Sequence, residues 1–142
     1  MSKHRTMTKS KLEIVGTLPA GTYYIGDPCY VIEDHWDAFL EALNAAEGKD
    51  GYLRGVVFTF AGRQVFVSAT NTGDGVYRDN EGVNYPVDAG MLAAIPVELT
   101  GTRGHVFTQA FEVGTDVGRW RQGKNGQLIG KRIKIGSIII KT

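Results

Sequence analysis

The sequence predicts a mainly β protein of the α+β class, an antiparallel β-sandwich or partly open barrel with one amphipathic helix. Short apolar runs recur roughly every ten residues, which is typical of many-stranded β domains. Glycine accounts for 19 of the 142 residues, and these glycines punctuate the apolar runs instead of forming one tract. Only residues 34–48 show helical periodicity. Together these observations favour two packed layers of short strands with the helix covering one face or end.

The length of 142 residues predicts one globular domain over residues 11–142. Residues 1–10 are basic and aperiodic, so we expect a flexible N-terminal arm there. Because Cys29 is the single cysteine, no intramolecular disulfide can form. The first residues lack an apolar leader and no apolar run reaches membrane-spanning length, so we expect a cytoplasmic protein without a membrane partner.

The N-terminal third predicts two strands and the helix. The pattern predicts two strands, at residues 13–17 and 21–26, on either side of a turn that contains Pro19. Asp34 is the expected N-cap of the helix, and Gly48 is expected to end it. Four apolar side chains then recur at the spacing of one helical face: Trp36, Phe39, Leu40 and Leu43.

Two hairpins follow the helix. Residues 56–60 and 64–68 flank a glycine-containing turn, and so do residues 75–78 and 83–87. Pro86 cannot donate a backbone hydrogen bond, so its strand is expected at a sheet edge or bulge.

The C-terminal third predicts further strands at residues 95–99, 106–113, 117–120 and 132–141. The last segment alternates in its first half and is continuously apolar in its second half. A continuous apolar run indicates a strand covered on both faces.

The segment from Tyr24 to Tyr30 carries the first candidate site. Asp27 precedes Pro28, so its backbone is extended and its carboxylate projects from a strand end. That geometry suits a ligand-binding group, and it equally suits an Asx-turn. Cys29 is better explained as a small buried cysteine than as a nucleophile, because nothing in the spacing of the histidines supplies a base.

A glycine-rich segment carries the second candidate site, with Asp74 between two glycines. It does not match a phosphate-binding P-loop, because no Lys-Ser/Thr pair follows, nor an EF-hand, because Val76 stands where that loop needs an oxygen ligand. If strand ends converge, Asp27, Asp74 and Asp88 form an acidic cluster. Such a cluster could hold Mg²⁺ or Ca²⁺, or supply a general acid and base. Each aspartate also has an adequate role as a turn residue.

The expected ligand-binding residues lie in these strand-end loops. Carboxylates there would bind hydroxyl or amino groups, and tyrosines would stack or donate hydrogen bonds. The set is Tyr24, Asp27, Tyr30, Thr72, Asp74, Tyr77, Asp79, Tyr85 and Asp88.

The charge distribution points to a third, weaker candidate. The net charge is only +1, well below that of a dedicated nucleic-acid module, but residues 119–142 contain seven cations and no acid. Trp120 is interleaved with these cations, as in single-strand nucleic-acid grooves. A solvated hairpin is the favoured explanation of the pattern. The candidate nucleic-acid residues are Arg119, Arg121, Lys131, Arg132 and Lys134.

Several ordered motifs resemble a family of small uncharacterised proteins found in bacteriophages and bacteria. They include Tyr-Ile-Gly-Asp-Pro-Cys-Tyr-Val at residues 24–31, Gly-Asp-Gly-Val-Tyr at 73–77 and Val-Asp-Ala-Gly at 87–90. The C-terminus is similar too, although Lys141 stands near where the family has an acid. The resemblance carries no function. It implies a phage or prophage origin, and hence an accessory protein in the cytoplasm of an infected bacterium.

We therefore expect a non-catalytic phage accessory protein that binds through its strand-end loops. The partner would be a small polar ligand, such as a nucleotide-like host defence signal, or a host protein that it inhibits. One alternative is a divalent-metal-dependent hydrolase using Asp27, Asp74 and Asp88. Others are a nucleic-acid-binding protein and a structural virion protein. The sequence does not tell whether a cofactor is used, and exposed edge strands would permit a small homo-oligomer.

Overall fold

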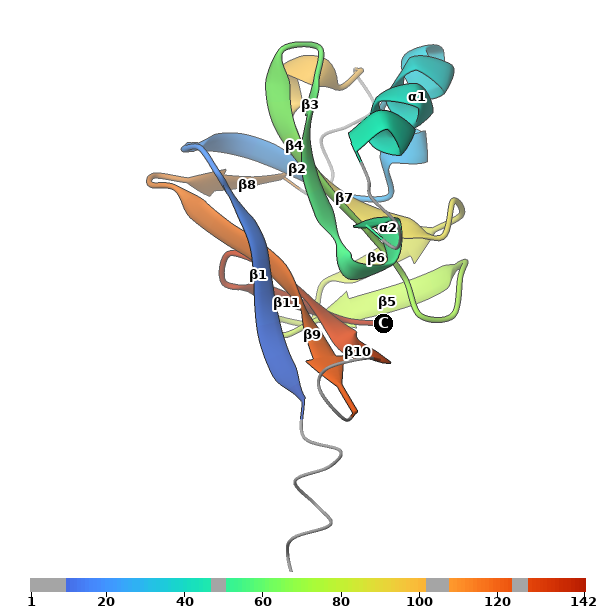
Figure 1. Cartoon of the computed structure of the whole chain (residues 1–142). Coiled ribbons are helices and arrows are strands. Elements are labelled where there is room, and N and C mark those ends of the chain that lie inside the picture. Colours follow the sequence, from blue (N-terminus) through green and yellow to red (C-terminus); the bar gives the residue numbers. More distant parts are fainter. Residues whose placement is uncertain (1–9, 47–50, 102–107, 124–127) are drawn as a thin grey trace, which may run out of the picture.

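The structure is a computed structural model that describes residues 10–46, 51–101, 108–123 and 128–142. These residues form two antiparallel β-sheets and a principal helix (Figure 1). The helices are α1, Trp36–Ala46, and the single turn α2, Gly51–Arg54. The strands are β1 Lys11–Leu18, β2 Gly21–Gly26, β3 Val56–Phe60, β4 Arg63–Ala69, β5 Gly75–Asp79, β6 Asn84–Val87, β7 Met91–Pro96, β8 Thr108–Phe111, β9 Thr115–Gln122, β10 Leu128–Ile135 and β11 Ile138–Lys141.

The two sheets differ in size and position. The larger sheet has six strands in the order β1-β9-β10-β11-β5-β6, and the central sheet has five in the order β3-β4-β7-β2-β8. The larger sheet packs on one face of the central sheet, and α1 covers the other (Figure 1). The predicted mainly β sandwich with one amphipathic helix is therefore confirmed. Both sheets are open, so the structure is not a closed barrel.

Two hydrophobic cores flank the central sheet. Between the sheets, Phe66 and Leu92 pack against Ile133, Ile135 and other aliphatic side chains of the larger sheet. On the opposite face, Phe39 and Leu43 of α1 pack against the central sheet. Strand β7 is buried along its whole length. The central sheet is thus packed on both faces except at its edge strand β8, which is largely exposed, whereas the larger sheet has one exposed face.

The helix matches its apolar stripe, because Phe39 and Leu43 are buried while the opposite face is exposed. Its start differs from the prediction. Asp34 lies within a 3-10 turn at Glu33–His35, and the α-helix begins only at Trp36. The chain therefore enters α1 through a tighter turn instead of through an Asp34 cap. Gly48 lies outside the described residues.

Both predicted hairpins are confirmed. Strands β3 and β4 pair in register from Val56 to Phe60, and β5 pairs with β6. Pro86 lies on β6, which is an edge strand of the larger sheet, as its missing N–H requires.

The C-terminal segment is a hairpin instead of one strand. Strands β10 and β11 pair antiparallel around a turn in which Gly136 has φ +61°. That left-handed conformation favours glycine, so the change from alternating to continuous apolar residues marks a reversal of the chain.

A second correction concerns residues 95–99. The strand there is β7, which ends at Pro96, and a 3-10 turn at Val97–Leu99 follows it. Ala93 and Ala94 have low β propensity, but they are completely buried between neighbouring strands. Burial overrides propensity here because small side chains fit beneath the packed layers.

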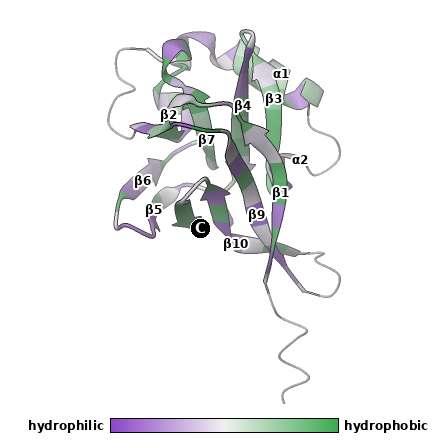
Figure 2. Cartoon of the chain, turned by 90° about the vertical axis from the view of Figure 1, so that its left-hand side faces the viewer, coloured by the Kyte–Doolittle hydropathy of each residue, from purple (hydrophilic) through white to green (hydrophobic). Residues whose placement is uncertain are grey.

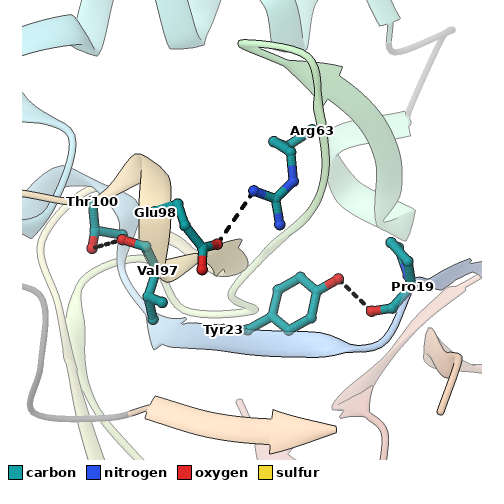
Figure 3. Close-up of polar contacts among 6 residues, drawn as sticks. All are labelled: Pro19, Tyr23, Arg63, Val97, Glu98 and Thr100. Atoms are coloured by element: carbon teal, nitrogen blue, oxygen red, sulfur yellow. Dashed lines mark hydrogen bonds and ion pairs between the residues drawn. The ribbon is translucent and has the colours of Figure 1, made fainter. Parts of the chain in front are cut away.

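Figure 3 shows polar contacts beside strand β2 of the central sheet, among residues of β2, β4 and the segments that flank them. Arg63 pairs with Glu98 at 3.3 Å, with 41% and 60% of the two side chains exposed. Nearby, the hydroxyl of Tyr23 donates to the carbonyl of Pro19 at 2.6 Å. An ion pair this exposed contributes little to stability. In the described part of the chain, no helix has the length and apolar character needed to cross a membrane.

Candidate functional site

Asp27 is a structural residue at the end of β2. Its side chain is completely buried. One carboxylate oxygen accepts the N–H of Cys29 at 2.8 Å, and the other accepts the N–H groups of Asp88 and Ala89, both at 2.7 Å. The carboxylate therefore makes the Asx-turn and also ties β2 to the loop after β6. We call these three contacts the Asp27 clamp.

Two tyrosines complete this loop cluster. Tyr24 is buried and donates its hydroxyl to the carbonyl of Asp27 at 2.9 Å, and burial raises the pKa of Tyr24. At the surface, the Tyr30 hydroxyl donates to Asp88 at 2.7 Å. That hydrogen bond, followed by burial, raises the pKa of Tyr30 to about 12. The fold thus brings Asp27 and Asp88 together, with Asp88 as the exposed member.

Asp79 organises the turn between β5 and β6. One carboxylate oxygen accepts the N–H groups of Glu81 and Val83, at 2.8 and 2.9 Å, and the other accepts the Tyr85 hydroxyl at 2.8 Å. Burial alone would raise the pKa of Asp79, but these hydrogen bonds outweigh it and the pKa is lowered. The Asp79 carboxylate is therefore charged and occupied within its own hairpin.

The glycine-rich loop before β5 is held by hydroxyl groups. Tyr77 is buried and donates to the carbonyl of Gly73 at 2.7 Å, and its oxygen lies 2.7 Å from the Thr72 hydroxyl. Asp74 is exposed at the tip of this loop. Asp74 and Thr72 are the two expected ligand residues here that reach solvent.

The three aspartates of the expected metal site do not come together as a ligand set. Across the described ranges, no group of three or more His, Cys, Asp or Glu side chains could hold a metal ion. Both carboxylate oxygens of Asp27 accept hydrogen bonds from backbone N–H groups, and Asp74 lies on a separate loop. The metal-dependent hydrolase hypothesis required Asp27, Asp74 and Asp88 to form one ligand set, and the structure does not bring all three together.

Cys29 is expected to react with iodoacetamide at pH 8 at least about 100-fold more slowly in the folded protein than in urea. Burial, followed by the hydrogen bond and charge of Asp27, raises the pKa of its thiol to about 12. The folded protein therefore holds little of the reactive thiolate. Mass spectrometry of an alkylation time course measures both rates on this single cysteine. Equal rates would return Cys29 to the list of candidate nucleophiles.

Arg119 lies in the interior, where it is 1% exposed. The predicted nucleic-acid role placed it at the surface, but its side chain points between the sheets. It makes six hydrogen-bond contacts, and every acceptor is a neutral oxygen. The acceptors are Ser68 Oγ, the Ala69 carbonyl, Asn71 Oδ1, the Gly130 carbonyl (twice) and Thr142 Oγ1. Burial lowers the pKa of Arg119 to about 10, so it stays charged at neutral pH.

Arg121 is also buried, at 7% exposed. Its guanidinium pairs with Glu13 of β1 at 3.1 Å, and among the described residues its Nε has no hydrogen-bond partner. Arg119 and Arg121 therefore hold strands together and cannot reach an external strand of nucleic acid.

The other predicted basic residues lie on the exposed face of the larger sheet or beside it. Lys131 and Arg132 are exposed, and Lys134 is half-buried. Strand pairing places Lys141 opposite Arg132, and Arg78 opposite Lys141. Residues opposite one another in register share a face. We call Arg78, Lys141 and Arg132 the basic row.

The basic row is a line of like charges across three adjacent strands. In the described part of the chain, none of its members forms an ion pair with a carboxylate. Arg78 donates from Nε to Asn84 at 3.1 Å, and the Arg132 guanidinium lies 4.4 Å from the centre of the Trp120 ring. Directly opposed like charges destabilise a sheet. The row thus costs folding stability and leaves its positive potential at the surface.

Apolar side chains continue this face beyond the row. Leu12 lies opposite Trp120, and Ile139 lies opposite Lys134. Ile14 on β1 is 43% exposed and Val76 on β5 is 67% exposed. Figure 2 shows hydrophilic and hydrophobic segments alternating along β9 and β10. The exposed face therefore combines cations, one aromatic ring and aliphatic side chains.

Sequence reasoning missed Arg78 and Lys141 because they are far apart in the chain. Only the pairing of β11 with β5 brings them together. The cation-rich C-terminal segment indicated a basic surface. It did not show that two of its arginines, Arg119 and Arg121, are buried.

Fold and site together define an antiparallel β-sandwich protein with an exposed basic sheet face. A comparison of the chain with protein-family models, curated proteins and solved structures found no match.

Proposed function

We propose that this protein is a non-catalytic binding protein whose basic row recognises a polyanion. The observation that carries the proposal is the register of Arg78, Lys141 and Arg132 on adjacent strands. Three cations stand side by side on an exposed face, and no carboxylate among the described residues neutralises them. An anionic partner would supply the missing charges.

The energetics favour a partner with several regularly spaced charges. Each opposed like-charge pair costs roughly 0.2–1 kcal/mol, and a bound polyanion would turn that repulsion into attraction. Binding would also release the counterions condensed on the polyanion, which makes the affinity depend on salt. A single small anion could neutralise only part of the row.

The strand-end loops are a weaker choice for the main site. Asp27 and Asp79 accept backbone N–H groups, and Tyr24, Tyr77 and Tyr85 are buried. A ligand there would have to break contacts that hold the loops. The phage origin, the host-defence signal and the inhibited host protein stay predictions, because no comparison tests them.

The double variant Arg78→Gln/Lys141→Gln is expected to bind a heparin fragment at least about 10-fold more weakly than the unaltered protein at 50 mM salt. The reason is the loss of two of the three charges in the row. Isothermal titration calorimetry at 50 and 200 mM salt measures the affinity and its salt dependence. The variant should also show a weaker salt dependence than the unaltered protein.

A matched control removes two cations elsewhere, the exposed Arg54 and the partly exposed Arg63, in Arg54→Gln/Arg63→Gln. It should keep nearly the full affinity. Removing opposed like charges should leave Arg78→Gln/Lys141→Gln at least as stable as the unaltered protein, so misfolding cannot explain lost binding. Equal losses in the two double variants, or an affinity independent of salt, would contradict the proposal.

A further inference from the structure

We infer that the polyanion is a single-stranded nucleic acid, with its phosphates on the basic row and its bases against Trp120. This inference rests on the proposed function and specifies its partner. It uses a different observation, namely the side chains that continue the exposed face next to the row.

The row ends at an aromatic ring. The Arg132 guanidinium lies over the Trp120 ring, 4.4 Å from its centre, so the last cation of the row and the ring are in cation–π contact. Leu12 follows Trp120 in register on the next strand. The order across the sheet is therefore cations, guanidinium on indole, then an aliphatic side chain.

That order matches the chemistry of an unpaired nucleotide chain. Proteins bind single strands by pairing a positive track for the backbone with aromatic or guanidinium planes on which bases stack. In a duplex each base is stacked between its neighbours. No base face is then free to contact Trp120 or the aliphatic side chains. An acidic protein segment would use the cations but would bring no planar base to stack against the exposed part of the ring.

The size and charge of the face agree with a short oligonucleotide. At the usual spacing of neighbouring strands, the six strands of the larger sheet extend over about 24 Å. Lys134 adds a half-buried cation beside the row. Asp116 shares the face, but Thr17 donates to it at 2.9 Å on the side of the sheet near β1. The repulsive charge thus lies away from the row.

The chain offers a clean optical probe, because it has two tryptophans. Trp36→Phe leaves Trp120 as the single tryptophan. Titration of this variant with a (dT)12 oligonucleotide is expected to quench the Trp120 fluorescence saturably. A 12-base-pair duplex at the same salt is expected to bind at least about 10-fold more weakly.

Two variants separate stacking from charge. Trp120→Leu should weaken (dT)12 binding roughly 10- to 100-fold in fluorescence anisotropy while leaving heparin binding unchanged. Trp120→Phe keeps an aromatic face and should retain most of the (dT)12 affinity. Thermal melting of both variants checks that they fold, and the retained heparin binding of Trp120→Leu is a second check.

The outcomes distinguish the two proposals. Preference for (dT)12 with a loss in Trp120→Leu supports the single-strand inference. Equal binding of (dT)12, duplex and heparin, with Trp120→Leu unaffected, overturns it and leaves polyanion binding in place. Failure of all three polyanions to bind overturns both.

Discussion

Replacing Arg119 by methionine is expected to lower the free energy of unfolding by about 3–5 kcal/mol. The guanidinium joins β9 to Ser68 and Ala69 of the central sheet, and to Gly130 and Thr142 on the C-terminal hairpin. Methionine would fill much of the volume but satisfy none of these oxygens. Buried acceptors left without donors cost about 1–3 kcal/mol each. Urea denaturation of the two proteins measures the difference.

Arg132→Met is the matched control, because it makes the same change at an exposed arginine. It should alter the free energy of unfolding by no more than about 0.5 kcal/mol. Arg119→Lys tests the geometry as well, since a lysine cannot reach acceptors on both sheets from one planar group. Equal unfolding midpoints for Arg119→Met and Arg132→Met would show that Arg119 does not hold the sheets together.

Asp27→Asn is expected to lower the free energy of unfolding by about 2–4 kcal/mol. Asparagine keeps one acceptor oxygen and presents an N–H₂ group where the second oxygen stood. Either the N–H of Cys29 or those of Asp88 and Ala89 would then face a donor in a fully buried site. The loop after β6 would separate from the end of β2. Differential scanning calorimetry measures the loss.

Asp74→Asn makes the same chemical change on an exposed loop. It should leave the stability within about 0.5 kcal/mol of the unaltered protein. The comparison also tests the ligand hypothesis for Asp27. If Asp27→Asn were as stable as Asp74→Asn, the carboxylate would be free for a ligand and the Asp27 clamp would not be structural.

Local patterns predicted most of the elements, because their causes are local. The apolar stripe of α1 depends on helical spacing, and the hairpins β3–β4 and β5–β6 depend on glycine turns between alternating runs. Prediction failed at β7, where two alanines lie in a strand against their intrinsic preference. It also failed at Gly136, where a long apolar run concealed a reversal of the chain.

The candidate site was less predictable. The sequence correctly marked Asp27 and Asp79 as special, but it could not distinguish a ligand-binding carboxylate from one that binds backbone N–H groups. Both roles place aspartate at a strand end beside glycine or proline. The choice depends on what the other loops present, and the fold presents N–H groups to both carboxylates.

The sequence by itself determined the mainly β class, the amphipathic helix and the cation-rich C-terminal segment, because composition and periodicity are properties of short stretches. Only the tertiary structure decided that Arg119 and Arg121 are buried, and that Arg78 and Lys141 join Arg132 on one exposed face. The physical reason is strand register. A side chain's face is set by the partner strand, and the strands that make the basic row come from distant parts of the chain.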